Sequence, residues 1–169
     1  LLNSDAVPIR PERICKELTE HLPSDALLVS DTGHAGMWTG GMVDLTEPGQ
    51  GFIRCAGSLG WGLPAVLGAK CALPDRPVVL FTGDGGFWYH LAEIETAVRQ
   101  KINAVIVVNN NHVLSHGLQG LTKIAGGELH AKHEFIWHYN DTDLAKVAES
   151  MGALGIRVDK PSEIDSALD

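Results

Sequence analysis

The stretch PVVLFTGDGGFWYHLAEIETAVRQKINAVIVVNNN, residues 77–111, decides the fold. It contains two short apolar runs, 77–81 and 103–108, of the kind that form buried strands. A helix is expected between them over 87–101, because apolar residues of one helical face recur there, and all four should lie in the core: Phe87, Leu91, Ile94 and Val98. A strand, a helix and a second strand in this order predict a right-handed crossover between parallel strands.

The same alternation continues on both sides of this stretch. Further helices are expected over 11–22, 63–73 and 143–151 and from residue 161, and further strands over 26–30 and 153–158. Strands that are apolar throughout and alternate with helices predict an α/β fold, a parallel sheet with helices on both faces.

The remaining stretches are less regular. Residues 1–10 have no periodicity and are expected to be a linker, so the predicted domain spans 11–169. Two stretches, 40–60 and 112–140, are expected to be long loops or to hold short helices, and loops of this length are usually functional. The chain is expected to be part of a longer polypeptide or one subunit of a split enzyme.

The composition excludes several classes of protein. With 44% hydrophobic and 20% charged residues among 169, the chain has the make-up of one globular domain. Its formal net charge of -8 has the wrong sign for binding nucleic acid through phosphate contacts. No apolar run is long enough to span a membrane, and the N-terminus lacks the pattern of a signal peptide, so a cytoplasmic protein is expected. Three cysteines without CxxC spacing favour neither disulfides nor zinc.

Polar residues follow three of the expected strands, at 31–34, 83–86 and 109–111. Because ligands bind outside the carboxyl ends of parallel strands, these segments should gather at one edge of the sheet. Asp84 offers a carboxylate and Asn111 an amide oxygen, which are the hard ligands that Mg²⁺ prefers beside substrate phosphates. The glycines that follow Asp84 would let the backbone approach a diphosphate closely: Gly85 and Gly86.

Other interpretations of these residues remain open. Gly-Asp-Gly-Gly could be a tight turn and Asn-Asn-Asn a strand exit, with no ligand at either. Residues 60–65 also satisfy the GxGxxA dinucleotide pattern, although Pro64 stands where a phosphate-binding N–H would be wanted. His112 and His116 could be solvent-facing loop residues or could transfer protons at the edge of the site.

The motifs resemble the signature of a known family, the thiamine diphosphate-dependent enzymes related to acetolactate synthase and pyruvate decarboxylase. In their diphosphate-binding domain a Gly-Asp-Gly is followed, after a spacer of about this length, by an Asn-Asn pair, as at 83–85 and 110–111 here. The resemblance implies that thiamine diphosphate binds through Mg²⁺, with three protein ligands to the metal: Asp84, the Asn111 side chain and the backbone carbonyl of Val113.

Two further stretches resemble the same domain. GSLGWGLPA, residues 57–65, is similar to a family segment whose large apolar residue props the cofactor in a bent shape. A carbonyl two residues earlier accepts a bond from the aminopyrimidine. The resemblance gives these catalytic roles to Leu59 and Gly57, with Ser58 beside them at the cofactor. DTGHAGMW, residues 31–38, is similar to the first diphosphate loop, which adds three cofactor-binding residues: Thr32, Gly33 and His34.

The resemblance also implies partners and a reaction class. In the family, the cofactor lies between two domains, and a glutamate of a separate pyrimidine-binding domain protonates the aminopyrimidine. Activity is therefore expected only when that domain is supplied, as the missing part of the same polypeptide or as a partner subunit, and the enzyme is expected to be a homo- or hetero-oligomer. The implied enzyme is a lyase or transferase, a decarboxylase or carboligase of 2-oxo acids or related carbonyl substrates. A FAD site, found in some relatives on a middle domain, would lie outside this chain. The alternative is a non-catalytic regulatory or assembly subunit with the same fold.

Overall fold

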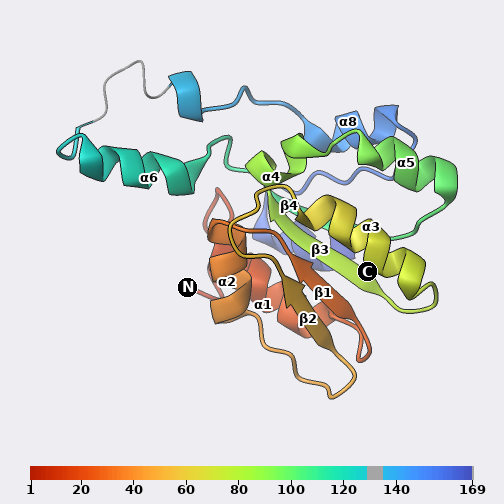
Figure 1. Cartoon of the computed structure of the whole chain (residues 1–169). Coiled ribbons are helices and arrows are strands. Elements are labelled where there is room, and N and C mark those ends of the chain that lie inside the picture. Colours follow the sequence, from red (N-terminus) through yellow and green to blue (C-terminus); the bar gives the residue numbers. More distant parts are fainter. Residues whose placement is uncertain (129–134, 169) are drawn as a thin grey trace.

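A four-stranded parallel sheet forms the centre of the molecule in the computed structural model, which describes residues 1–128 and 135–168, with the backbone alone at 119. The strand order is β2-β1-β3-β4 (Figure 1). The strands are β1 (Leu27–Ser30), β2 (Gly51–Arg54), β3 (Val78–Gly83) and β4 (Val105–Asn109).

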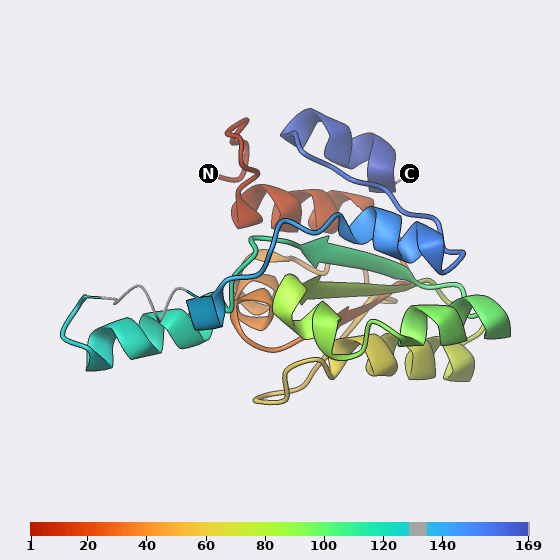
Figure 2. The same cartoon turned by 90° about the horizontal axis from the view of Figure 1, so that it is seen from above.

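Helices cover both faces of this sheet, which confirms the predicted α/β fold. In Figure 2, α1 and α9 lie on one side of the sheet and α3 lies on the other, while α6 points away from it. The helices are α1 (Pro11–His21), α2 (His34–Met42), α3 (Gly62–Ala72), α4 (Asp84–Tyr89), α5 (Glu93–Gln100), α6 (Ser115–Ile124), α8 (Leu144–Ser150), the 3₁₀ turn η1 (Pro161–Glu163) and α9 (Ile164–Leu168).

The core divides into two clusters because successive side chains of a strand point to opposite faces. Leu27 and Val29 of β1 join a cluster with residues of α3, α4 and α5. Leu28, between them in sequence, joins a second cluster with residues of α1 and α2. The inner strands are therefore apolar over residues 27–29 and 78–81, as expected where both faces are buried, and the buried polar residues Ser30 and Thr82 follow at their carboxyl ends.

The expected helix over 87–101 is wrong as a single element. The chain forms α4 and α5, which are separated by a break at residues 90–92. The ring Nδ1 of His90 lies 2.9 Å from the carbonyl of Gly60, so the break is tied to the loop before α3. Phe87 and Ile94 are both buried in the same cluster across the break, which makes the sequence pattern look continuous. Val98, expected in the core, is 38% exposed.

Three other expectations differ from the structure. Residues 40–60 contain the edge strand β2, whose Ile53 and Arg54 are exposed and so carry no buried-strand signal. The expected strand at 153–158 does not form in the described part of the chain; Leu154 there is 86% exposed. Within 112–140, α6 is a helix of 10 residues, while 129–134 lie outside the described residues.

Candidate functional site

The carboxyl ends of β1, β3 and β4 meet at one edge of the sheet. Ser30 pairs with Phe81, and Gly83 pairs with Asn109. The residues that follow these strands are therefore brought together, as the sequence predicted for 31–34, 83–86 and 109–111. The loop from β2 to α3 reaches the same edge, because β2 runs parallel to β1.

Asp31 is the polar centre of this edge. Its carboxylate is 1% exposed and accepts hydrogen bonds from the backbone N–H groups of Gly60 and Gly62 at 3.1 and 3.0 Å. Its own neighbour, Thr32, donates a third N–H at 2.7 Å. The hydroxyl of Thr82 lies 3.4 Å away. A buried carboxylate needs such partners, and here they fix the start of α3 to the end of β1.

Thr32 connects two of the segments that the sequence assigned to the cofactor. Its Oγ1 accepts a hydrogen bond from the backbone N–H of Gly57 at 3.1 Å. Gly57 and Gly33 both have positive φ, of 83° and 75°, a region that favours glycine. Gly57 and Ser58 are exposed, and Leu59 is half-buried. The loop 57–59 thus presents its surface at the edge where Thr32 holds it.

Asp84 begins α4 and is 3% exposed. Burial raises the pKa of its carboxyl above the ordinary 3.8, because the charged form loses hydration. The His112 ring and three backbone N–H groups lower it in part, those of Gly85, His112 and Val113. The oxygen Oδ2 of Asp84 is buried and has no hydrogen-bond partner among the described residues. An ionised oxygen without a partner is costly in a protein interior, and a cation would satisfy it.

The Asn-Asn-Asn exit of β4 forms two tight side-chain turns. The side-chain oxygen of Asn110 accepts from the N–H of His112 at 3.1 Å, and that of Asn111 accepts from Val113 at 3.3 Å. His112 has a positive φ of 57°. The chain therefore bends sharply toward Asp84, and the N–H groups of His112 and Val113 contribute to the pKa of its carboxyl.

The expected metal ligands fit Mg²⁺ in kind. Asp84 supplies a carboxylate oxygen without a partner, Asn111 an amide oxygen and Val113 a backbone carbonyl. All three are hard oxygen donors, and Mg²⁺ is typically held by one or two carboxylates, with water and phosphate in the remaining positions. No cluster of three or more His, Cys, Asp or Glu side chains suited to a metal occurs in residues 1–128 and 135–168.

The two glycines after Asp84 are buried, and a side chain at each would meet a different neighbour. A Cβ on Gly86 would lie 2.8 Å from Thr82 Oγ1 and 2.9 Å from Asp31 Oδ2. A Cβ on Gly85 would collide with Cδ2 of Leu114. Gly86 therefore permits the close approach of α4 to Asp31, whereas Gly85 lies beneath the segment that leads into α6.

The predicted loop residue His34 begins α2 and contacts the start of α6. Its Nδ1 lies 2.8 Å from the hydroxyl of Ser115. Its ring stacks on Trp38 with centroids 5.4 Å apart and lies at the same distance from the ring of His116. His112 instead faces Asp141, at 3.5 Å. The two histidines that the sequence grouped together are thus held by different partners.

Two residues of the site were not assigned a role from the sequence. The sequence puts Asp31 in the first loop, but its role as a shared acceptor arises only in the fold, where the end of β1 meets the start of α3. His90 lay inside the expected helix, and its contact with Gly60 spans 30 residues of sequence. Asp31 at the end of a buried apolar run was the one available signal, since a carboxylate there needs partners.

No helix in the described ranges is both long and apolar enough to cross a bilayer.

Comparison with known proteins identifies the family. A family model described as "Thiamine pyrophosphate enzyme, C-terminal TPP binding domain" matches residues 31–169. The chain is 33% identical to the acetolactate synthase large subunit of Haemophilus influenzae, over 95% of this chain and 27% of that protein. It is 35% identical to a probable acetolactate synthase of Mycobacterium bovis, over 99% of this chain and 30% of that protein.

A relative with a different name matches over the same region. The sulfoacetaldehyde acetyltransferase of Alcaligenes xylosoxydans is 29% identical, over 95% of this chain and 26% of that protein. The chain spans less than a third of the length of these relatives. The parallel sheet and the edge built around Asp31 and Asp84 agree with this match. The family model over residues 31–169 and the similar proteins show that the chain belongs to the thiamine pyrophosphate enzymes, as their C-terminal TPP-binding domain.

Proposed function

We propose that this chain binds the diphosphate of thiamine diphosphate through Mg²⁺, as one half of an enzyme that acts on 2-oxo acids or related carbonyl substrates. The observation that carries the proposal is the buried oxygen Oδ2 of Asp84, which has no hydrogen-bond partner in the described residues. A divalent ion would remove this unfavourable state, and a diphosphate beside an aspartate needs a bridging metal to avoid repulsion.

The family resemblance, together with the position of these residues at one edge of the sheet, supports a role for each of them. Asp84, the Asn111 side chain and the Val113 carbonyl would hold the metal. Thr32, Gly33 and His34, at the start of α2, would contact the diphosphate from the end of β1. Gly85 and Gly86 would contribute their backbone N–H groups from the first turn of α4.

The loop after β2 would orient the organic part of the cofactor. When bound, thiamine diphosphate supplies a nucleophilic carbon that attacks the carbonyl carbon of the substrate. Leu59 would press against the bound cofactor as an apolar support. The carbonyl of Gly57 would accept a hydrogen bond from the aminopyrimidine, and Ser58 would line the same side of the cofactor. Thr32 would keep this loop in place through its bond to the N–H of Gly57.

A pyrimidine-binding domain from outside these residues would supply the acid that activates the aminopyrimidine. The curated relatives are more than three times as long as the matched segment, which leaves room for such a domain in them. The reaction is then a decarboxylation or carboligation, and the working form is an oligomer. The substrate class is supported by the names of the relatives, acetolactate synthase and sulfoacetaldehyde acetyltransferase.

The dinucleotide interpretation of residues 60–65 has less support. The N–H groups of Gly60 and Gly62 already donate to Asp31, so neither is directed at a phosphate. A non-catalytic subunit of the same fold would have no need for a buried carboxylate oxygen without a partner at a ligand edge. The metal–diphosphate site accounts for that oxygen, and the alternatives do not.

The direct test measures the thermal midpoint of the 169-residue chain with thiamine diphosphate, in Mg²⁺ and in excess chelator. Stabilisation is expected only with Mg²⁺, and thiamine without its diphosphate should give none. Asp84→Ala should abolish the shift, whereas Asp25→Ala, an exposed aspartate before β1, should leave it unchanged. Equal stabilisation in chelator, or a larger shift with NAD, would contradict the proposal.

A further inference from the structure

His21, the last residue of α1, makes two hydrogen bonds far from the candidate site. Its ring Nδ1 lies 2.9 Å from the backbone carbonyl of Glu17, one turn earlier. Its ring Nε2 lies 2.6 Å from a carboxylate oxygen of Asp165 in α9. The second bond joins the helix at one end of the chain to the helix at the other, and the two helices pack against each other (Figure 2).

Both partners of the His21 ring are acceptors. A carbonyl oxygen carries no proton, and an ionised carboxylate carries none either. A neutral imidazole has one N–H and can donate only one of the two bonds, whichever tautomer it adopts. Both bonds form together only when both ring nitrogens carry protons. The geometry thus requires the imidazolium, the charged form of His21.

The surroundings of the ring favour that charge. Besides Asp165, a carboxylate oxygen of Glu17 lies 3.8 Å away. Glu17 is buried and is paired with Arg13 at 2.6 Å and Lys16 at 3.7 Å. The C-terminus of α1 adds the negative end of its helix dipole. The bonds to Glu17 and Asp165 raise the pKa of His21 above its ordinary 6.5, against the opposing effect of burial.

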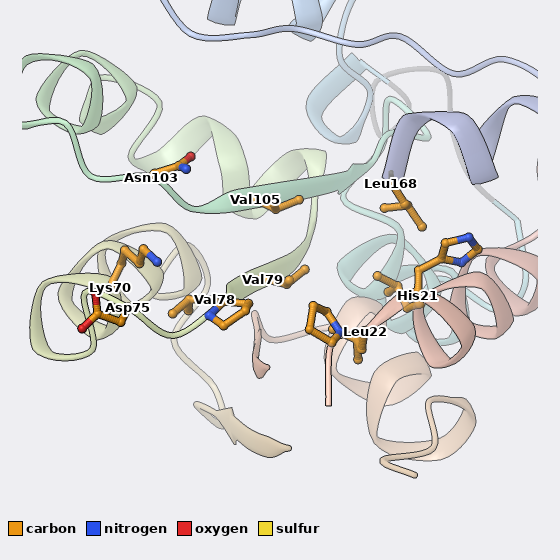
Figure 3. Close-up of a pocket in the computed structure, with 12 residues that line it drawn as sticks. His21, Leu22, Lys70, Asp75, Val78, Val79, Asn103, Val105 and Leu168 are labelled. Carbon is orange, nitrogen blue, oxygen red and sulfur yellow. The ribbon is translucent and has the colours of Figure 1, made fainter. Parts of the chain in front are cut away.

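A cavity of about 330 Å³ lies behind this contact, over β3 and β4. In Figure 3, His21 and Leu168 stand at one end of the cavity, and Lys70 and Asp75 at the other. Lys70 donates to the backbone carbonyl of Arg76 at 2.7 Å, so its ammonium group is already engaged. At the His21 end, α9 contributes Leu168 to the lining beside residues of α1, and Ile164 of α9 is buried.

We propose that His21, Glu17 and Asp165 form a pH-sensitive latch, in which the protonated His21 ring holds α9 against α1 and loss of its proton releases α9 and opens the cavity at that end. The latch is independent of the cofactor, because none of its residues lies at the carboxyl edge of the sheet.

The direction of the pH dependence follows from linkage. A base whose pKa is higher in the docked state than in the released state binds its proton more tightly when docked. The latch is therefore complete below the ordinary value of 6.5 and is lost as the pH rises through the docked pKa. The docking equilibrium changes by about tenfold for each unit by which the two pKa values differ.

Nuclear magnetic resonance on the 169-residue chain tests the protonation state. At pH 5.5 the ¹⁵N shifts of both His21 ring nitrogens should be those of N–H groups, and the ring should titrate above 6.5. Amide exchange of residues 164–168, corrected for intrinsic rates, should be slow at pH 5.5 and faster at pH 8.5. A ring that is neutral at pH 5.5, or protection that does not depend on pH, would overturn the latch.

Variants separate the latch from general stability. Asp165→Asn should lower the pKa of His21 and reduce protection of α9 at pH 5.5. Asp159→Asn removes a carboxylate of the same segment that faces Arg157 and should change neither. His21→Gln should make α9 protection independent of pH. An unchanged His21 pKa in Asp165→Asn would overturn the proposal, even if that variant were less stable.

Discussion

The carboxylate of Asp31 accepts a hydrogen bond from the backbone N–H of Gly62 at 3.0 Å, which joins the end of β1 to the first residue of α3. The same carboxylate holds Gly60 and Thr32. A single buried acceptor therefore connects the first loop, through Thr32, to the loop that carries Leu59. The two cofactor segments predicted from separate motifs are one structural unit.

Asp31→Asn should strongly destabilise the chain. The amide keeps one acceptor oxygen and turns its NH₂ group toward either the N–H of Gly62 or the N–H groups of Thr32 and Gly60, which then lack an acceptor. The charge of the acceptor is lost at all of these bonds. The expected loss in the free energy of unfolding is on the order of 3 kcal/mol, measured by urea denaturation. Asp25→Asn, which changes an exposed side chain, serves as the control. A loss no larger than that of the control would show that the Asp31 bonds contribute little.

Asp84 should make the metal-free protein less stable as the pH rises. Its pKa is raised by burial, so the folded state binds this proton more tightly than the unfolded state. Stability contributed by the proton is present below 3.8 and is lost as the pH rises through the raised, folded pKa. Unfolding titrations in chelator should show this dependence in the native chain and lose it in Asp84→Asn. An identical pH dependence in both chains would refute the assignment.

Two glycines should respond to alanine in opposite directions. A Cβ on Gly86 would crowd Thr82 and Asp31, so Gly86→Ala should destabilise by about 1–3 kcal/mol. Gly68 lies inside α3 with open space around its Cα, and Gly68→Ala should stabilise by about 0.5–1 kcal/mol. Thermal and urea unfolding measure both. Equal effects at the two positions would mean that the packing around Gly86 is looser than described.

Leu59→Ala should separate catalysis from metal binding, as a consequence of the proposed function. The side chain is half-buried on a loop, so the fold should be little affected. Turnover, measured after reconstitution with a pyrimidine-binding domain, should fall much further than Mg²⁺ affinity. Glu47→Ala, at an exposed residue before β2 and outside the cofactor-binding set, is the control. Unchanged turnover in Leu59→Ala would remove this residue from the catalytic set.

The 169-residue chain alone should show no consumption of 2-oxo acids. Without a second wall, the cofactor would stay exposed to water and would lack the acid that activates it. Activity should appear when a pyrimidine-binding domain is added, measured as substrate loss with thiamine diphosphate and Mg²⁺ present. Full activity of the chain by itself would refute the need for a partner.

The inner strands could be predicted from the sequence because both faces of β1 and β3 are buried, and this makes the first residues of each strand, 27–29 and 78–81, continuously apolar. The edge strand β2 could not, since its Ile53 and Arg54 face solvent. Phe87 and Ile94 kept a helical spacing across a break that depends on His90 meeting Gly60. Such contacts between distant segments leave no periodic signal.

The position of the candidate site could be predicted from the sequence, whereas the contacts within it could not. The strand exits predicted which segments would meet, because parallel strands end at one edge. The shared acceptor role of Asp31, the unpartnered oxygen of Asp84 and the cover of Leu114 over Gly85 depend on tertiary packing. The order of the strands thus predicts which polar residues lie at the site, but it does not predict their hydrogen-bond and packing partners.

Gly83 pairs with Asn109, so the register between β3 and β4 fixes where Asn111 lies relative to Asp84. A slip of one residue would displace the exit of β4 by about 3.3 Å and exchange its inward and outward side chains. An extra residue inserted within β4 should then abolish metal binding while the sheet survives. The same insertion at the break between α4 and α5 leaves the pairing of β3 with β4 unchanged. Metal binding should therefore survive an insertion at the break and be lost on an insertion within β4.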